Sequence, residues 1–154
     1  MENKILQLNN LTNGLHFLSL GGIGEIGANC YLYGCDGKWI MIDLGLSFAD
    51  EKFPGVDLLV PKIDHIDSIQ DNLEAIIISH GHEDHAGAVA FFANKIKCPV
   101  YATKFAKLLI ENRLKEFNKI DGFILNELSL DEELILNNFK LNFIPTTHSI
   151  PEPS

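Results

Sequence analysis

The sequence predicts a single α/β domain in which strands and helices form layers. Its 154 residues, 46% hydrophobic and 21% charged, can bury a substantial core and are typical of a globular protein. The first part of the chain carries strand-like segments joined by turns. The middle part then alternates strand-like and helical segments. Hairpin strands followed by such alternation indicate a mixed, layered α/β fold.

Three strands are expected first, from segments rich in aromatic and β-preferring side chains. They cover residues 14–20, 28–34 and 38–43. The dipeptide Asp36-Gly37 between the last two is a strong signal for a tight hairpin turn. A loop with Phe53-Pro54-Gly55 follows, and then a short polar stretch over residues 64–72.

The remaining segments alternate in type. Residues 73–79 contain three consecutive isoleucines and predict a buried strand. The later elements expected are a helix over residues 86–97, a strand over residues 99–102, an amphipathic helix over residues 103–118, and three strand-like runs within residues 120–147, with turns at Asp121-Gly122 and Asn137-Asn138.

Composition bears on location and partners. No apolar stretch approaches the roughly 18 residues of a membrane span, and residues 1–5 lack the features of a signal peptide, so a cytoplasmic protein without a membrane partner is expected. The three cysteines, Cys30, Cys35 and Cys98, fit reduced thiols. The formal charge of −9 has the wrong sign for a stand-alone nucleic-acid binder, because neutralised phosphates supply most non-specific affinity.

The run from Gly22 to Gly27 matches the dinucleotide fingerprint G-x-G-x-x-G. That fingerprint requires a helix directly after it, whose N-terminus holds the pyrophosphate. Here the strand pattern of residues 28–34 follows instead. We therefore interpret the run as a glycine-rich turn between two strands, one that could line a functional site.

The strongest functional signal is the run His80-Gly81-His82-Glu83-Asp84-His85, which lies between the strand at 73–79 and the helix at 86–97. Imidazoles with a nearby carboxylate are typical zinc ligands. An Asp84 helix cap would explain one residue but not three histidines in six positions. We predict that His80 and His82 hold one metal, with Asp84 and His85 projecting toward a second.

Two residues elsewhere complete the candidate site. His148, at the end of a strand-like segment, is predicted to supply a further metal ligand. Asp43 ends the strand at 38–43 and is either a turn former or a carboxylate that orients a ligand histidine; we favour the second. His16 and His65 have no such context and are taken as structural or surface residues.

Several motifs occur in an order that resembles one family. H-x-H-x-D-H with a strand-ending Asp and a later His resembles the metallo-β-lactamase superfamily. The full set looks like the N-terminal portion of ribonuclease J, of the β-CASP group. It comprises residues 20–27, Asp43-Leu44-Gly45, Pro54-Gly55-Val56-Asp57, residues 80–85, Cys98-Pro99-Val100-Tyr101 and His148-Ser149-Ile150-Pro151-Glu152.

The resemblance implies an αββα sandwich with two Zn²⁺ ions that share a bridging hydroxide, and hydrolysis of RNA internally and from the 5′ end. His80, His82 and His148 would hold the first zinc, and Asp84, which would also be catalytic, and His85 would belong to the second. Asp43 would lie outside the metal shell. RNA would be the partner of the completed protein.

Parts of the family pattern have no counterpart in these 154 residues: the bridging Asp, later histidines, the β-CASP insert and the C-terminal domain. The expectation is therefore an incomplete N-terminal half of the sandwich, with exposed sheet edges and an exposed apolar face. It would hold one zinc or fewer and be inactive alone, unless a complementary fragment or a homo-oligomer completes it. Two alternatives are a thioester or lactone hydrolase of the same superfamily and a non-enzymatic remnant that binds one zinc weakly.

Overall fold

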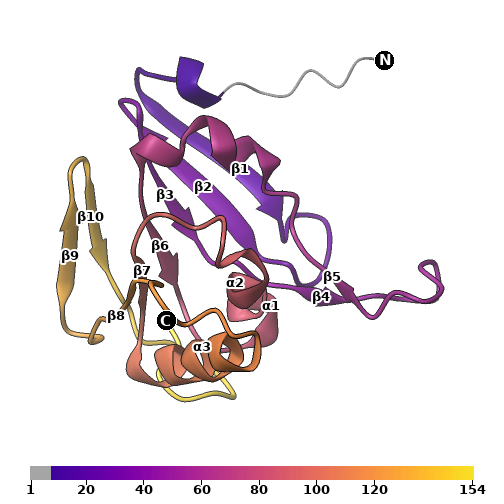
Figure 1. Ribbon diagram of the computed structural model, residues 1–154. Helices are drawn as coiled ribbons and strands as arrows, with labels where there is room; N and C mark the ends of the chain where they lie inside the picture. Colours follow the sequence, from indigo (N-terminus) through magenta and orange to yellow (C-terminus); the bar gives the residue numbers. More distant parts are fainter. Residues whose placement is uncertain (1–7) are drawn as a thin grey trace, which may run out of the picture.

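The computed structural model describes residues 8–154 and is built around a six-stranded mixed sheet in the order β1-β2-β3-β6-β7-β8 (Figure 1). The strands are β1 (Leu15–Gly21), β2 (Cys30–Cys35), β3 (Lys38–Ile42), β6 (Leu73–Ile78), β7 (Val100–Ala102) and β8 (Leu125–Glu127). β1, β2 and β3 are antiparallel neighbours, whereas β3, β6, β7 and β8 run parallel. The predicted α/β class and these strand positions are confirmed.

The predicted turn between β2 and β3 has the backbone that its sequence favours. Asp36 and Gly37 adopt φ values of 48° and 81°. Positive φ at both central residues is the signature of a type I′ turn, whose twist matches that of the flanking strands. The glycine-rich run at residues 22–27 leads through residues 28–29 into strand β2 and not into a helix, as expected for a turn between two strands.

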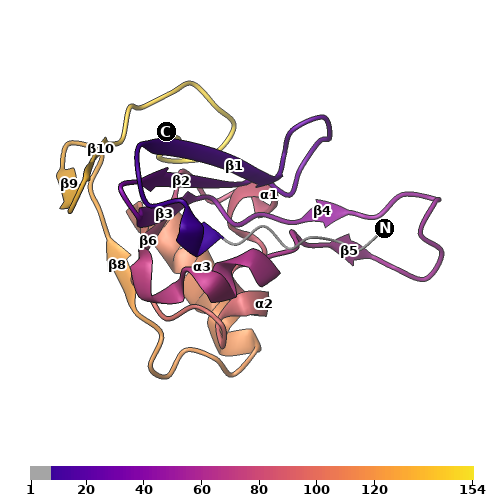
Figure 2. The same ribbon diagram turned by 90° about the horizontal axis from the view of Figure 1, so that it is seen from above.

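The helices gather on one face of the sheet, where they form the main core (Figure 2). These elements are η1 (Leu8–Asn10), η2 (Asp64–Ser68), η3 (Gln70–Asn72), α1 (Glu83–Ala86), α2 (Val89–Phe92) and α3 (Lys104–Glu116). Alternation along each strand assigns its side chains to the two faces. Trp39 and Met41 of β3 therefore join the helical side, while Ile40 faces the other way.

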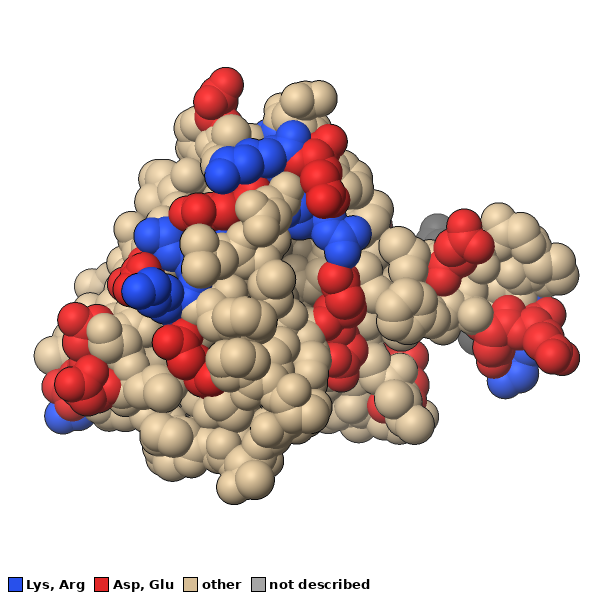
Figure 3. All heavy atoms as spheres, turned by 90° about the horizontal axis from the view of Figure 1, so that it is seen from below, with Lys and Arg blue, Asp and Glu red and all other residues tan. Residues whose placement is uncertain are grey.

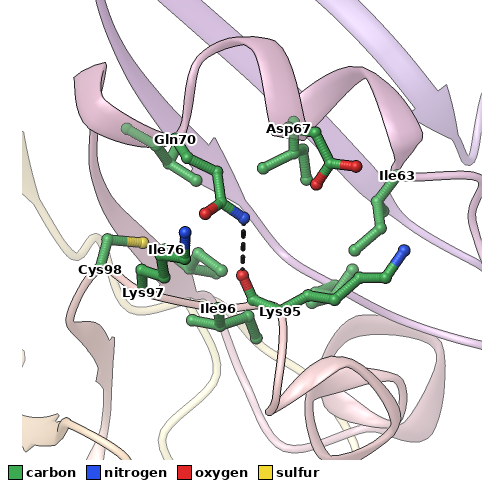
Figure 4. A pocket seen from close by; sticks show the side chains of 11 residues that line it. Ile63, Asp67, Gln70, Ile76, Lys95, Ile96, Lys97 and Cys98 are labelled. Atoms are coloured by element: carbon green, nitrogen blue, oxygen red, sulfur yellow. Dashed lines mark hydrogen bonds between the residues drawn. The ribbon is translucent and has the colours of Figure 1, made fainter.

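The short helices η2 and η3 pack over the edge of this core and leave no cavity large enough for a ligand. The Gln70 side chain donates a hydrogen bond of 2.8 Å to the Lys95 carbonyl and ties η3 to the segment that leads into β7 (Figure 4). Ile63, Ile76 and Cys98 line the same place. We interpret the shallow pocket between these residues as a feature of core packing and not as a binding site.

One predicted helix was wrong in its extent. Residues 86–97 were expected to form a single helix, but the chain forms α1, which begins at Glu83, and then α2. The physical reason is that backbone groups which would continue the ladder are used elsewhere. The Asp84 carbonyl accepts from Asn29 N–H at 2.9 Å, the His85 carbonyl accepts from Leu44 N–H at 2.8 Å, and Ala88 N–H donates to the Leu44 carbonyl at 3.0 Å.

The opposite face of the sheet is covered only in part. The hairpin of β9 (Glu133–Leu136) and β10 (Phe139–Asn142) packs its apolar side chains over Ile40, Ala75 and Ile77. Beyond the hairpin, Leu15 is 76% and Phe17 is 52% exposed on the outer face of β1. The expected exposed apolar face is therefore present on the β1–β2 side.

Three further observations complete the description of the fold. The short strands β4 (Ser47–Phe48) and β5 (Leu58–Leu59), which the sequence did not reveal, pair at the base of an arm that projects from the body (Figure 2). The three cysteines are free thiols. Across residues 8–154, none of the helices is long and apolar enough to cross a bilayer.

Gly45 is the point of closest approach between the β3–β4 connection and α1. A Cβ at this position would lie 1.7 Å from the Asp84 carbonyl oxygen, a contact that cannot be relieved by a side-chain rotation. We expect Gly45→Ala to lower the free energy of unfolding by about 3 kcal/mol or more, at the upper end of overpacking costs. Urea denaturation of the purified chain measures it.

Gly55→Ala is the matched control, because Gly55 has φ +79° but nothing within 4 Å of the added Cβ. It carries only the cost of a left-handed backbone, about 1–2 kcal/mol. Equal destabilisation by the two variants would contradict the close approach at Gly45.

Candidate metal centre

The predicted site residues converge at the carboxyl ends of two neighbouring parallel strands. Asp43 directly follows β3, and Ser79 and His80 directly follow β6. Open α/β sheets commonly bind ligands at this edge, because loops from adjacent strands meet there. The α1 segment lies across the same edge and brings Asp84 and His85 to it (Figure 1).

Asp43 organises the site through its buried carboxylate. Its Oδ1 accepts from the Ser79 N–H at 2.8 Å, and its Oδ2 accepts from the Ser79 hydroxyl at 2.9 Å and from His85 Nδ1 at 2.7 Å. The residue has φ 61° and is 3% exposed. A left-handed backbone costs about 1–2 kcal/mol, whereas each hydrogen bond to a charged group contributes about 1.5–3 kcal/mol. The hydrogen bonds therefore outweigh the strain.

These hydrogen bonds also fix the tautomers of two histidines. Ser79 has one hydroxyl proton and donates it to Asp43, so its oxygen is left to accept from His80 Nδ1 at 3.0 Å. His85 uses Nδ1–H on Asp43. In the neutral form, both rings therefore carry their proton on Nδ1 and leave Nε2 unprotonated, which is the form of imidazole that binds a metal.

Three imidazoles meet at the mouth of the site. His80 Nε2 lies 3.1 Å from His82 Nδ1, which lies 3.0 Å from His148 Nε2, and all three nitrogens are within 4.8 Å of one another. Zn–N bonds of about 2.0–2.1 Å at tetrahedral angles separate neighbouring nitrogens by about 3.3 Å. The spacing and the donor chemistry therefore fit one zinc ion.

The electrostatics of His80 support the same conclusion. Burial lowers the pKa of His80, and repulsion from the charge of His85 lowers it further, to about 4. The negative charge of Asp43 opposes these effects only in part. The His80 imidazole is therefore neutral at physiological pH. His80 is 5% exposed, His82 is half-buried and His148 is exposed, so the cluster has one open side.

Asp84 and His85 form a second, smaller group beside the three histidines. Asp84 Oδ2 lies 3.4 Å from His85 Nε2, and the Asn29 amide nitrogen lies 3.2 Å from each of these atoms. Burial disfavours the His85 cation, but the hydrogen bond and charge of Asp43, together with the charge of Asp84, raise its pKa above the usual value. The pair supplies one carboxylate and one imidazole.

Sequence reasoning missed two residues that shape the site. Ser79 was assigned only to the strand, yet it links Asp43 to His80. Asn29 was assigned only to the strand after the glycine-rich turn, yet its side chain also donates to the Asp84 carbonyl at 3.1 Å and accepts from the Tyr31 hydroxyl at 2.8 Å. The available signal was position: Ser79 directly precedes His80, and Asn29 lies two residues after the glycine-rich turn that could line the site.

The structure places the remaining histidines away from the cluster. His16 stacks on Trp39 and contacts the Asn13 carbonyl, and His65 belongs to η2. The six predicted site residues, in contrast, are all brought together. Their roles as metal ligands and as an orienting carboxylate remain predictions, which the next subsection develops.

Comparisons with known proteins agree with this geometry. The profile of the metallo-beta-lactamase superfamily matches residues 23–150. Ribonuclease J 1 of Streptococcus pyogenes is 35% identical over 141 residues, and Ribonuclease J2 of Bacillus subtilis is 32% identical over 141 residues. Each match covers 92% of this chain and 25% of the relative, so the chain spans about a quarter of the length of these relatives.

Solved structures match at the level of the fold. The MIM-2 metallo-beta-lactamase aligns with a TM-score of 0.56 and 17% identity, over 92% of this chain and 52% of that one. The metallo-beta-lactamase fold protein YhfI from Bacillus subtilis aligns with a TM-score of 0.52 and 16% identity, over 87% of this chain and 53% of that one. The predicted fold family is confirmed, with this chain as a partial domain.

Asp43→Asn tests the hydrogen-bond assignment at the site. In chelator-treated protein we expect the pKa of His85 to fall, because the substitution removes the carboxylate whose hydrogen bond and charge raise it. NMR titration of the imidazole carbon-bound protons measures the change. Asp50→Asn is the control, because Asp50 lies on the arm and pairs with Lys52. An unchanged or higher His85 pKa in Asp43→Asn would contradict the assignment.

Proposed function

Because the chain belongs to the metallo-beta-lactamase superfamily, we propose that its site binds zinc and serves in the hydrolysis of RNA phosphodiester bonds. The single observation that carries the proposal is the cluster of three converging imidazole nitrogens in His80, His82 and His148. The relatives named ribonuclease J, which match 92% of the chain, support RNA as the substrate class.

The residues divide between two metal positions. His80, His82 and His148 would hold the first zinc, and Asp84 and His85 would contribute to the second. When bound, zinc supplies Lewis-acid chemistry: it lowers the pKa of a water molecule and stabilises the negative charge that develops on a phosphodiester. Zinc is the metal favoured by this imidazole-rich set, and Mn²⁺ is a possible competitor.

The chain's own residues orient the donors. Asp43 holds the His85 ring through Nδ1, and Ser79 holds the His80 ring through Nδ1. Asn29 steadies Asp84 through the carbonyl and the carboxylate. This is the arrangement by which residues outside the metal shell fix the tautomer and orientation of ligands. Asp84 is also the proposed catalytic carboxylate, because its side chain is 42% exposed and lines the same groove as His82.

Two observations support the view that the 154-residue chain binds at most one zinc and does not cleave RNA by itself. Within residues 8–154, the three histidines are the only converging group of three or more His, Cys, Asp or Glu ligand atoms, so Asp84 and His85 lack a third ligand of this kind. The net charge is −9, and on the face in Figure 3 lysines and arginines are interspersed with acidic side chains and form no continuous basic stripe. Phosphate binding needs such a surface.

We therefore propose that the RNA backbone is bound mainly by residues other than these. They would belong to the same protein, to a complementary fragment or to another copy of the chain. A cytoplasmic location follows from this function and is part of the same proposal. The alternative substrates, thioesters and lactones, would need no basic surface, so assays with a chromogenic thioester separate the two.

Metal content of the purified 154-residue chain, measured by elemental analysis together with RNA cleavage on the same sample, tests the proposal. We expect one zinc or fewer per chain and no cleavage. Two zincs with RNA cleavage would contradict the claim that the second position is incomplete. Thioester hydrolysis, with RNA left intact by a longer form of the protein, would contradict RNA as the substrate.

His82→Ala tests the ligand assignment separately. Loss of a residue outside the metal shell costs about 10–100-fold in affinity, so removal of one of three direct ligands should cost more than about 100-fold. Asp43→Asn should fall within the smaller range. Competition with a chromogenic zinc chelator measures both, and His65→Ala is the control because His65 lies outside the cluster. Unchanged zinc affinity in His82→Ala would refute the assignment.

A further inference from the structure

A groove beside the metal centre combines a polar end with an unusually exposed apolar end. It has a volume of about 560 Å³ and is lined by Ile26, Leu46 and Phe48 together with His82 and Asp84. That volume lies within the range of about 300–1,000 Å³ typical of small-ligand sites. The groove therefore begins at two proposed site residues and extends away from them over apolar side chains.

The apolar end is presented by two projecting segments. Ile26 belongs to the β1–β2 loop and is 97% exposed, and Phe48 belongs to β4 at the base of the arm and is 73% exposed. Figure 2 shows the loop and the arm projecting on the same side of the molecule near α1. Large apolar side chains that cluster beside a site and remain exposed to solvent mark an interaction surface.

The chemistry of the groove favours a flat, uncharged ring over a phosphate at this end. None of its lining residues is Lys or Arg, and Glu83 and Asp84 contribute negative charge. Glu83 is paired with Arg113 and Asp84 with His85, and neither of these two partners lines the groove. A phosphate placed against Ile26 and Phe48 would meet no cation, whereas a nucleobase would meet apolar surface and an aromatic ring.

We propose that Phe48, backed by Ile26, is a stacking platform for an unpaired nucleobase whose phosphate lies toward His82 and Asp84. The inference rests on the proposed function and adds a residue that positions the substrate. Every base has a π-face, so such a platform tolerates different sequences. A base on Phe48 cannot remain stacked in a duplex, so the site selects single-stranded RNA next to the bond that is cleaved.

The test compares adenosine 5′-monophosphate with ribose 5-phosphate as probes, by NMR titration of zinc-supplemented, isotope-labelled protein. The two probes share the phosphate and differ in the base. We expect the nucleotide to bind about fivefold tighter or more, with shifts at the Ile26 methyl and Phe48 ring signals. Phe48→Ala should remove this advantage and leave ribose 5-phosphate binding unchanged, whereas Phe48→Trp should keep it.

Phe53→Ala is the matched control, because Phe53 is on the same arm and 45% exposed but does not line the groove. Phe48→Leu keeps apolar area without an aromatic ring and separates stacking from simple burial. Equal binding of the two probes, or a base advantage that survives in Phe48→Ala, would overturn the proposal.

The platform and the proposed function can fail independently. RNA cleavage by a longer form of the protein that is insensitive to Phe48→Ala would remove the platform and leave the hydrolase. A Phe48-dependent preference for the nucleotide, in a protein whose longer form neither binds zinc nor cleaves RNA, would support the platform and remove the proposed hydrolysis.

Discussion

The rest of the site depends on one buried carboxylate. Asp43 accepts two hydrogen bonds from Ser79 and one from His85, and its own N–H donates to the Ile77 carbonyl at 2.8 Å. These contacts join the end of β3 to the end of β6 and to α1. A carboxylate that is 3% exposed is stable only when its acceptor capacity is filled. The requirement to satisfy Asp43 therefore positions His85 directly and His80 through Ser79.

Backbone hydrogen bonds also hold the α1 segment in place beside Asp43. The loop before β2 and the connection after β3 donate to carbonyls of α1 that would otherwise serve the helix itself. This close approach is possible because Gly45 presents no Cβ to the Asp84 carbonyl. The metal-binding run is thus held between two loops that come from distant parts of the sequence. Such support on both sides keeps donors in place more firmly than a free loop would.

Charged and apolar side chains are distributed so that metal binding, base binding and phosphate binding would be served by different surfaces. The candidate metal centre concentrates imidazoles and carboxylates, and the neighbouring groove offers Ile26 and Phe48. The net charge of −9 provides no general attraction for RNA. Since the chain spans about a quarter of the length of its ribonuclease J relatives, we propose that phosphate recognition lies largely outside residues 1–154.

The sequence by itself determined the strands of the main sheet and the identity of the candidate ligands. Strand positions followed from β-preferring residues and strong turn signals, and the ligands within residues 80–85 followed from histidines crowded between a strand and a helix. Both are local patterns that one segment carries alone. The tertiary structure decided the break between α1 and α2, the roles of Ser79 and Asn29, and the cover that β9 and β10 give to the sheet. Each of these depends on partners far away along the chain, such as Asn29 and Leu44 against residues 84–88. No local preference encodes such pairings, because they form only when the sheet brings its loops to one edge.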